Sequence, residues 1–240
     1  MLARRKKNIV TTGIGCLVVI AAVLGYLEIF TKGIDRLPPR PCDGAADRET
    51  AARALPSARS AEERGKLRQN RSDGNFFFGC YVRTSGGSVI SGEVESRDAA
   101  PGPWRDHYAE QGHVVDPVDV SSGDIRAVAH PDHAYVYVPC TPPGKKRGEA
   151  LNAYALTVDA RTIGETRVQG DELRQVIVDF AYQLARHTYK AVDCQESRAF
   201  PKELPRLPAA ERRERPGTAD VQGHPVAGFP AYPSHAPGRR

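Results

Sequence analysis

The stretch GDELRQVIVDFAYQLARHTYKAVDC, residues 170–194, predicts the principal helix of the fold. Its apolar side chains recur at spacings of three and four, which is the period of a helix that buries one face. They are Leu173, Val176, Ile177, Phe180, Leu184 and Ala191. Gly170 or Asp171 supplies the start of the helix, and Cys194 comes just past its end. We expect this helix to lie across one face of an antiparallel sheet.

The strands of that sheet are predicted from alternating apolar residues and from the turn residues between them. NFFFGCYVR, residues 75–83, is rich in aromatic residues and has a period of two. The glycine-rich TSGGS, residues 84–88, connects it to VISGEVES, residues 89–96, as a hairpin. A second hairpin is predicted in IRAVAHPDHAYVYVPC, residues 125–140, around a type I turn at HPDH. ALNAYALTVDA, residues 150–160, predicts one further strand. One face of the first strand carries Phe76, Phe78, Cys80 and Val82.

Three other segments have weaker patterns. CDGAADRETAARAL, residues 42–55, predicts a helix with Asp43 or Asp47 as its cap. ARSAEERGKLRQNRSDG, residues 58–74, is polar throughout and predicts a solvated helix turn or a loop. DAAPGPWRDHYAEQG, residues 98–112, predicts an irregular crossing with a short helix, in which the single tryptophan fills part of the core.

Four cysteines downstream of Cys16 predict two disulfide bonds, because an even number in an oxidising space usually pairs. They are Cys42, Cys80, Cys140 and Cys194. Three connectivities are open, and we favour Cys42 with Cys80 and Cys140 with Cys194, since each pair ties a helical segment to a nearby strand. The alternatives are four unpaired thiols in a cytoplasmic domain or a zinc site, but no C-x-x-C pair occurs.

Residues 9–30 are the only long apolar run of the chain and predict a transmembrane helix. As a helix this run would span about 33 Å, which matches the hydrocarbon core of a bilayer. Bulky Leu27, Ile29 and Phe30 at its far end argue against cleavage as a signal peptide. A lipid-attachment site at Cys16 is disfavoured, because only residues 8–12 separate it from the basic cluster and Gly13 stands where a leucine is expected. We interpret Cys16 as a small packing residue in lipid. That cluster, residues 4–7, places the N-terminus in the cytoplasm.

The predicted organisation has five parts. Residues 1–7 are the cytoplasmic N-terminus, residues 8–30 the transmembrane anchor and residues 31–41 a Pro-containing stalk. Residues 42–197 form an extracytoplasmic α+β domain, an antiparallel sheet with a packed amphipathic C-terminal helix. Residues 198–240 are rich in Pro and Arg and predict a disordered tail, because they cannot bury enough apolar surface to offset their ordering entropy.

The distribution of charge argues against nucleic acid as a partner. The formal net charge of the chain is +5, of which residues 1–7 carry +4 and residues 200–240 carry +3. This leaves −2 for residues 8–199, so the folded part lacks the basic surface expected of a nucleic-acid binder.

The histidines near the second hairpin are the only cluster that resembles a metal or acid-base site. His130 and His133 flank the turn, Asp132 can orient one imidazole, and His107 and His113 lie earlier in the chain. Turn chemistry alone explains HPDH, so exposed turn residues are the default interpretation and the two turn histidines are weak metal candidates. No P-loop, dinucleotide fingerprint, nucleophile elbow or H-E-x-x-H helix is present, and we expect no cofactor.

The order of these features resembles a group of bacterial envelope proteins. A membrane anchor, a Pro stalk, PCDG…ARAL, FFFGCYV with its hairpin, and a late helix ending at Cys194 follow one another. This order is similar to the uncharacterised membrane-anchored or lipoprotein-like extracytoplasmic domains of high-GC Gram-positive bacteria. Arginine supplies 26 of the 34 basic residues, which fits a high-GC genome. The resemblance covers roughly residues 8–197 and implies no catalytic residues.

We therefore expect a single-pass protein in the cell membrane, with its C-terminal domain outside the cell as a binding or assembly module at the envelope. Its expected partners are the membrane and an envelope protein or ligand. One alternative is an envelope hydrolase with a cleft near His130 and His133, for which those imidazoles and a carboxylate would line the cleft. The other alternative is a cytoplasmic domain with inverted topology.

Overall fold

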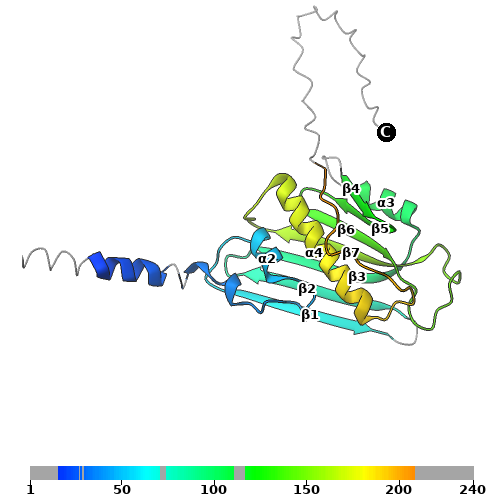
Figure 1. Cartoon of the computed structure of the whole chain (residues 1–240), viewed down its shortest axis with the longest axis horizontal. Coiled ribbons are helices and arrows are strands. Elements are labelled where there is room, and N and C mark those ends of the chain that lie inside the picture. Colours follow the sequence, from blue (N-terminus) through cyan, green and yellow to red (C-terminus); the bar gives the residue numbers. More distant parts are fainter. Residues whose placement is uncertain (1–15, 27, 29, 71–73, 111–116, 209–240) are drawn as a thin grey trace, which may run out of the picture. The chain divides into compact units, whose positions relative to one another are not determined.

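Seven strands of the described residues form one antiparallel sheet (Figure 1). The computed structural model describes residues 16–26, 28, 30–70, 74–110 and 117–208. The strands are β1 (Ala61–Gln69), β2 (Phe76–Thr84), β3 (Val89–Asp98), β4 (Val118–Ser122), β5 (Ile125–Ala129), β6 (His133–Pro139) and β7 (Tyr154–Ile163). Their spatial order is β1-β2-β3-β7-β6-β5-β4, so β7 joins the first three strands to the second three. This confirms the predicted α+β class with an antiparallel sheet.

Helices cover the two faces of the sheet unequally. The long helix α4 (Gly170–Ala191) crosses one face and contacts β7, β6, β3 and β5, and α2 (Arg48–Ala54) packs against it (Figure 1). The 3₁₀ helix η1 (Ile34–Arg36) contacts α2 and β1. The other face carries α3 (Pro101–Ala109), which contacts β5 and β6. We call the first face the α4 face.

The α4 face holds the larger core. Phe76, Phe78, Cys80 and Val82 are buried while the residues between them are only partly buried, which confirms the predicted alternation. A Cβ placed on Gly92 of β3 would lie 2.5 Å from Leu184 Cδ1, so the glycine allows α4 to approach the sheet closely. Of the apolar residues predicted on α4, only Ala191 is exposed, because the buried face passes through Thr188, Tyr189 and Val192 at the end of the helix.

A smaller core lies under α3. Trp104 is buried against Tyr137, with the ring centroids 5.3 Å apart, and Tyr108 stacks on Tyr135 at 4.2 Å. Because Tyr135 and Tyr137 alternate with Val136 along β6, their rings lie on the face opposite α4. The predicted role of the tryptophan as a core residue is confirmed.

Two disulfide bonds tie the α4 face together, as predicted. Cys42 pairs with Cys80 and Cys140 pairs with Cys194, with Cα–Cα distances of 5.4 Å and 5.2 Å. The first bond fixes the loop before α2 onto β2, and the second fixes the chain beyond α4 next to the end of β6. These are the pairs that the sequence favoured.

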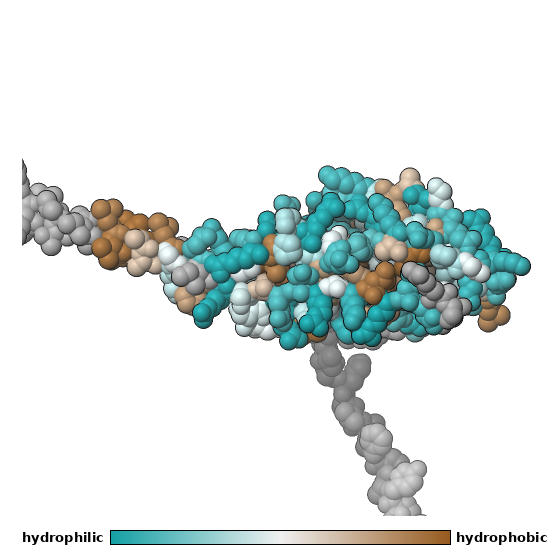
Figure 2. Space-filling model, turned by 90° about the horizontal axis from the view of Figure 1, so that it is seen from below, coloured by the Kyte–Doolittle hydropathy of each residue, from teal (hydrophilic) through white to brown (hydrophobic). Residues whose placement is uncertain are grey.

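The prediction of a loop or helix turn for residues 58–74 is wrong, because β1 pairs with β2 along its whole length, from Ala61↔Thr84 to Gln69↔Phe76. The sequence of β1 has no alternation of apolar and polar residues that would predict a strand. The reason is that β1 is an edge strand whose side chains are exposed or only partly buried. Figure 2 looks onto this edge of the sheet, and the surface there is mostly hydrophilic. Strand β4, at the opposite edge, was not predicted either.

The prediction of a transmembrane helix over residues 8–30 is also wrong. Among the described residues, no helix is both long enough and apolar enough to cross a bilayer. Residues 1–15, 27 and 29 lie outside the described residues, and with them the predicted cytoplasmic segment.

The segments on either side of the predicted domain pack onto it. In the expected stalk, residues 31–41, Ile34 and Leu37 are buried, and the Gly33 N–H donates to the Ala58 carbonyl at 2.7 Å. The start of the expected tail also contacts the domain, because Leu204 is buried and the Leu207 N–H donates to Gln175 Oε1 at 2.8 Å. The rest of the expected tail, residues 209–240, lies outside the described residues.

Candidate functional site

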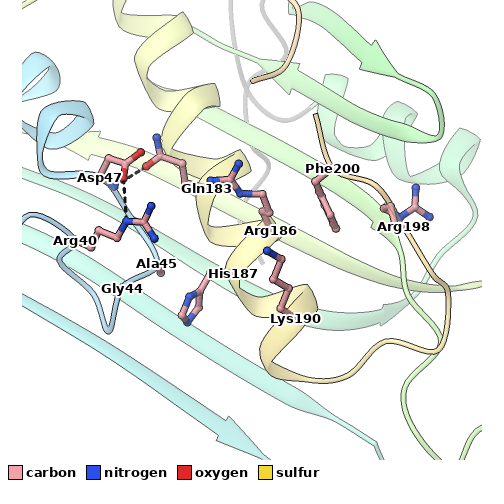
Figure 3. Close-up of a pocket in the computed structure, with 10 residues that line it drawn as sticks. All are labelled: Arg40, Gly44, Ala45, Asp47, Gln183, Arg186, His187, Lys190, Arg198 and Phe200. Carbon is pink, nitrogen blue, oxygen red and sulfur yellow. Dashed lines mark hydrogen bonds and ion pairs between the residues drawn. The ribbon is translucent and has the colours of Figure 1, made fainter. Parts of the chain in front are cut away.

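A hollow of about 520 Å³ lies beside the solvent-facing side of α4 (Figure 3). Its walls come from three segments that are distant in the sequence: the loop of residues 40–47, α4, and the chain after α4. We call it the basic hollow. It is lined by Arg40, Gly44, Ala45, Asp47, Gln183, Arg186, His187, Lys190, Arg198 and Phe200.

The loop on one side of the basic hollow is fixed at two points. The disulfide of Cys42 joins the loop to β2. At its other end, the Asp47 N–H donates to Gln183 Oε1 at 2.8 Å, and Gln183 Nε2 donates to Thr50 Oγ1 at 2.9 Å. Between these points the backbone turns tightly, with positive φ at Cys42, Asp43 and Gly44. The loop is therefore held in place before any ligand arrives.

The opposite side is formed by residues 194–207, which we call the C-terminal strap. The Tyr189 hydroxyl donates to the Glu196 carbonyl at 2.6 Å, and the Tyr182 hydroxyl donates to the Pro201 carbonyl at 2.7 Å. The Phe200 ring packs edge-on against Tyr189, with the centroids 5.0 Å apart. Together with the disulfide at Cys194, these contacts hold the strap along α4.

Glu196 fixes the beginning of the strap to the end of β6. Its carboxylate accepts from the Thr141 N–H at 2.8 Å and from Thr141 Oγ1 at 2.5 Å. Partial burial alone would raise the pKa of Glu196, but the hydrogen bonds from Thr141 outweigh it and the pKa is lowered. The ionised carboxylate is therefore the form that holds the strap.

Positive charge dominates the lining. Arg40, Arg186, Lys190 and Arg198 face one carboxylate, that of Asp47. The Arg40 Nε lies 3.8 Å from Asp47 Oδ1, and both side chains are exposed, so this pair is weak (Figure 3). Arg198 is already neutralised by an ion pair with Asp124.

Arg186 and Lys190 are left as the cations with the least compensation. The Arg186 Nη1 donates to the Lys202 carbonyl at 3.3 Å, a contact that leaves the guanidinium charge unbalanced. Within the described part of the chain, the Lys190 ammonium has no ion-pair partner. The two side chains are four residues apart and so lie on the same side of α4.

His187 contributes a neutral polar group. Its ring is half-buried against Phe78, with the centroids 5.3 Å apart, and this burial lowers the pKa of His187. Asp43 acts in the opposite direction but does not cancel the effect. At neutral pH the uncharged imidazole has one donor and one acceptor next to the cations.

The histidines that the sequence singled out do not line the basic hollow. His130 is fully buried, and its Nε2 donates to the Tyr108 carbonyl at 2.8 Å, so the default of an exposed turn residue is wrong for it. The cause is α3, which covers the turn. His133 is partly buried, with its Nδ1 2.9 Å from Asp132 Oδ1. His107 lies on α3 against Tyr108, and His113 lies outside the described residues.

No group of three or more His, Cys, Asp or Glu side chains among the described residues is arranged to hold a metal ion. The four cysteines that could bind zinc are all used in disulfides. The lining of the basic hollow itself offers charged and hydrogen-bonding side chains for recognition.

Sequence reasoning missed the basic hollow. The one local signal was the spacing of Arg186, His187 and Lys190, which places three basic residues on the polar side of the predicted helix. A charged helix face is usually a solvated one. Arg40 and Arg198 could not be added to that group, because tertiary contacts bring their segments to α4: the hydrogen bonds of Gln183 hold the loop, and the disulfide at Cys194 and the strap contacts hold the chain after the helix.

Comparisons with protein-family models, with curated proteins and with solved structures found no match for this chain. The resemblance to envelope domains of high-GC Gram-positive bacteria therefore stays a prediction.

Proposed function

We propose that this protein is an extracytoplasmic binding module whose basic hollow holds an anionic ligand. One observation carries the proposal: Arg40 and the two α4 cations Arg186 and Lys190 line one hollow that has a single lining carboxylate, Asp47, whereas the fourth lining cation, Arg198, is neutralised by Asp124. Like charges repel, so such a cluster costs stability unless it has a counter-charge to bind. The cluster is held by two disulfides and the strap, which keeps the cations together.

A phosphate or carboxylate group is the ligand chemistry that suits this lining. Guanidinium groups bind such oxyanions through paired hydrogen bonds, and an ammonium adds a compact charge. The volume of about 520 Å³ lies within the range of small-molecule sites. Phe200 offers an apolar surface for the remainder of the ligand.

The compartment is part of the proposal and is supported by the two disulfides. Disulfides form and persist in oxidising spaces outside the cytoplasm. A binding module at the cell envelope would meet anionic polymers and anionic small molecules there.

The test is isothermal titration of the full chain with inorganic pyrophosphate and with citrate. The double variant R186Q/K190Q should weaken binding of at least one probe by tenfold or more, because charge-assisted hydrogen bonds contribute about 1.5–3 kcal/mol each. The matched control is R83Q/R161Q, which removes the same charge from exposed positions on the opposite face of the sheet. Equal weakening in the two double variants, or no binding to the unmodified chain, would refute the proposal.

The alternative of a hydrolase with a cleft near His130 and His133 has less support. A general base must reach the substrate, whereas His130 is fully buried and its Nε2 is engaged by a backbone carbonyl. His133 does have a carboxylate neighbour, Asp132, but neither residue lines the basic hollow.

A further inference from the structure

Among the described residues that line the basic hollow, His187 is the one whose side chain titrates near neutral pH. Its ring is half-buried and contacts Phe78 of β2, with the centroids 5.3 Å apart. Within the described part of the chain, neither ring nitrogen of His187 has a hydrogen-bond partner, and neither is sealed from solvent. The polar edge of the ring is therefore available to a ligand in the hollow (Figure 3).

The His187 ring lies among charged groups from three segments. On α4, His187 directly follows Arg186 and precedes Lys190 by three residues, so it shares one side of the helix with Lys190. Strand β2 contributes the apolar ring of Phe78. The charged groups of the loop and the strap that complete these surroundings are Arg40, Asp43, Asp47 and Arg198.

The neutral imidazole is the form that suits the empty hollow. Burial lowers the pKa of His187, and Asp43 acts in the opposite direction without cancelling that effect. A positive charge on the ring would also stand next to Arg186 and Lys190, the two cations with the least compensation. An anion bound to these two cations reverses the balance, because an opposite charge within about 4–6 Å favours the charged form of a titratable group.

We propose that His187 couples occupancy of the basic hollow to pH: an anion bound beside Arg186 and Lys190 draws one proton from the solvent onto the imidazole. The charged ring has an N–H on both nitrogens, so one of them can donate to the anion as a third cationic contact. When the anion leaves, the proton returns to the solvent. This inference rests on the proposed function, because it concerns the regulation of the same site.

The direction of the pH effect follows from the proton balance. If binding takes up a proton, a lower pH favours the complex, and a higher pH favours the empty hollow. The basic hollow should therefore hold its ligand most tightly in mildly acidic surroundings and release it as the pH rises above neutral. Arg186 and Lys190 keep their charges over this whole range and supply the part of the affinity that does not depend on pH.

The experiment is isothermal titration of the full chain with inorganic trimetaphosphate, an anion whose charge does not change between pH 5.5 and pH 7.5. The unmodified chain should bind it about tenfold more tightly at pH 5.5, because the charged ring adds a charge-assisted hydrogen bond. The variant H187Q should reduce this ratio to twofold or less, since glutamine keeps a donor and an acceptor but does not titrate. H107Q is the matched control, an exposed histidine on α3, and should keep the full ratio.

A second measurement separates the coupling from a structural role of the ring against Phe78. The His187 pKa, followed by NMR in the unmodified chain, should rise when the anion is added. A ring that only packs would titrate at the same pH with and without the anion. This reading does not depend on the folding of H187Q.

The outcomes distinguish this inference from the proposed function. Binding of equal strength at the two pH values, a pH ratio that H187Q retains, or an unchanged His187 pKa would overturn the coupling while the anion site stands. Absence of binding at both pH values would overturn the anion site and the coupling together.

Discussion

Phe77 and Phe78 are neighbours on one strand, yet they belong to two differently built faces of the sheet. Phe78 is fully buried beneath α4, whereas Phe77 is partly buried on the opposite face and touches Gly79. The α4 face also has both disulfides, α2 and the C-terminal strap. The face opposite α4 has a single short helix, α3, over only some of its strands.

This difference separates stability from recognition. The α4 face is closed by packing within the chain, so its residues are chosen for volume and fit. Over β1, β2 and β3 the face opposite α4 keeps charged side chains and partly buried aromatic rings at its surface, so its residues contribute less to stability. The predictions below test that separation from the largest expected effect to the smallest.

Truncating the two phenylalanines in turn is the most direct test. F78A should lower the free energy of unfolding by about 3–5 kcal/mol, because it leaves a cavity in a closed core. F77A should lower it by about 1 kcal/mol, since the ring is only partly removed from water. Urea denaturation at a concentration where the chain is monomeric measures both. Equal losses would mean that the face opposite α4 is packed as tightly as the α4 face.

Removing the disulfide of the strap should have the next largest effect. C140A/C194A opens a link across 54 residues and should cost about 4 kcal/mol on the chain-entropy account. C42A/C80A opens a link across 38 residues and should cost nearly as much. Hydrogen exchange distinguishes the two variants, because only C140A/C194A should deprotect amides of the strap. The same deprotection in both variants would contradict an independent role for the second bond.

The comparison of the two faces also explains what could be predicted from the sequence. Both β2 and α4 were predicted because a buried face leaves a period of two or of 3.6 in the apolar residues. Strand β1 was missed because one of its faces is exposed and the other, which includes Glu63 and Gly65, is only partly buried, so no run of alternating apolar residues marks it and pairing with β2 determines it. His130 was expected at the surface, because its burial depends on α3, which a local pattern around the turn does not contain.

The basic hollow could not be predicted for a related reason. Arg40, Arg186 and Arg198 are spread over nearly the whole domain in sequence, and no spacing rule connects them. The disulfide pairs were predictable, but the position of the loop and the strap beside α4 follows from tertiary packing. The transmembrane prediction relied on the length of an apolar run, and no helix among the described residues is both long enough and apolar enough to cross a membrane.

Two glycines test the packing of the faces at finer scale. In G92A the new Cβ would lie 2.5 Å from Leu184 Cδ1 on the α4 face, and the cost should be about 1–3 kcal/mol. In G79A the new Cβ would lie 3.2 Å from the Phe77 ring, which can move toward solvent. G79A should therefore be neutral or stabilising, because alanine reduces the freedom of the unfolded chain. Thermal unfolding compares the two, and a larger cost for G79A would reverse the assignment of the faces.

The smallest expected effects concern two aspartates whose pKa values shift in opposite directions. The ion pair with Arg198 of the strap lowers the pKa of Asp124. Burial raises the pKa of Asp159 on β7, where Oδ1 is buried without a hydrogen-bond partner among the described residues. The unfolded value for both is about 3.9.

The signs of the resulting pH effects are opposite. The folded state releases the Asp124 proton more readily than the unfolded state, so its contribution is complete above pH 4 and is lost as the pH falls through the lowered pKa. The folded state holds the Asp159 proton more tightly, so its contribution is present below pH 4 and is lost as the pH rises through the raised pKa.

Asparagine variants isolate the pH dependence of stability that each aspartate contributes. The stability deficit of D124N relative to the unmodified chain should shrink as the pH falls below 4. The unmodified chain should instead lose stability relative to D159N as the pH rises from 3 toward 6. Urea denaturation at half-unit steps of pH measures both differences. The exposure of Asp124 keeps its effect small, since a surface ion pair contributes at most about 1 kcal/mol. Parallel slopes in the two variants would show that the half-buried carboxylate of Asp159 on β7 is solvated like that of Asp124, the partner of the strap.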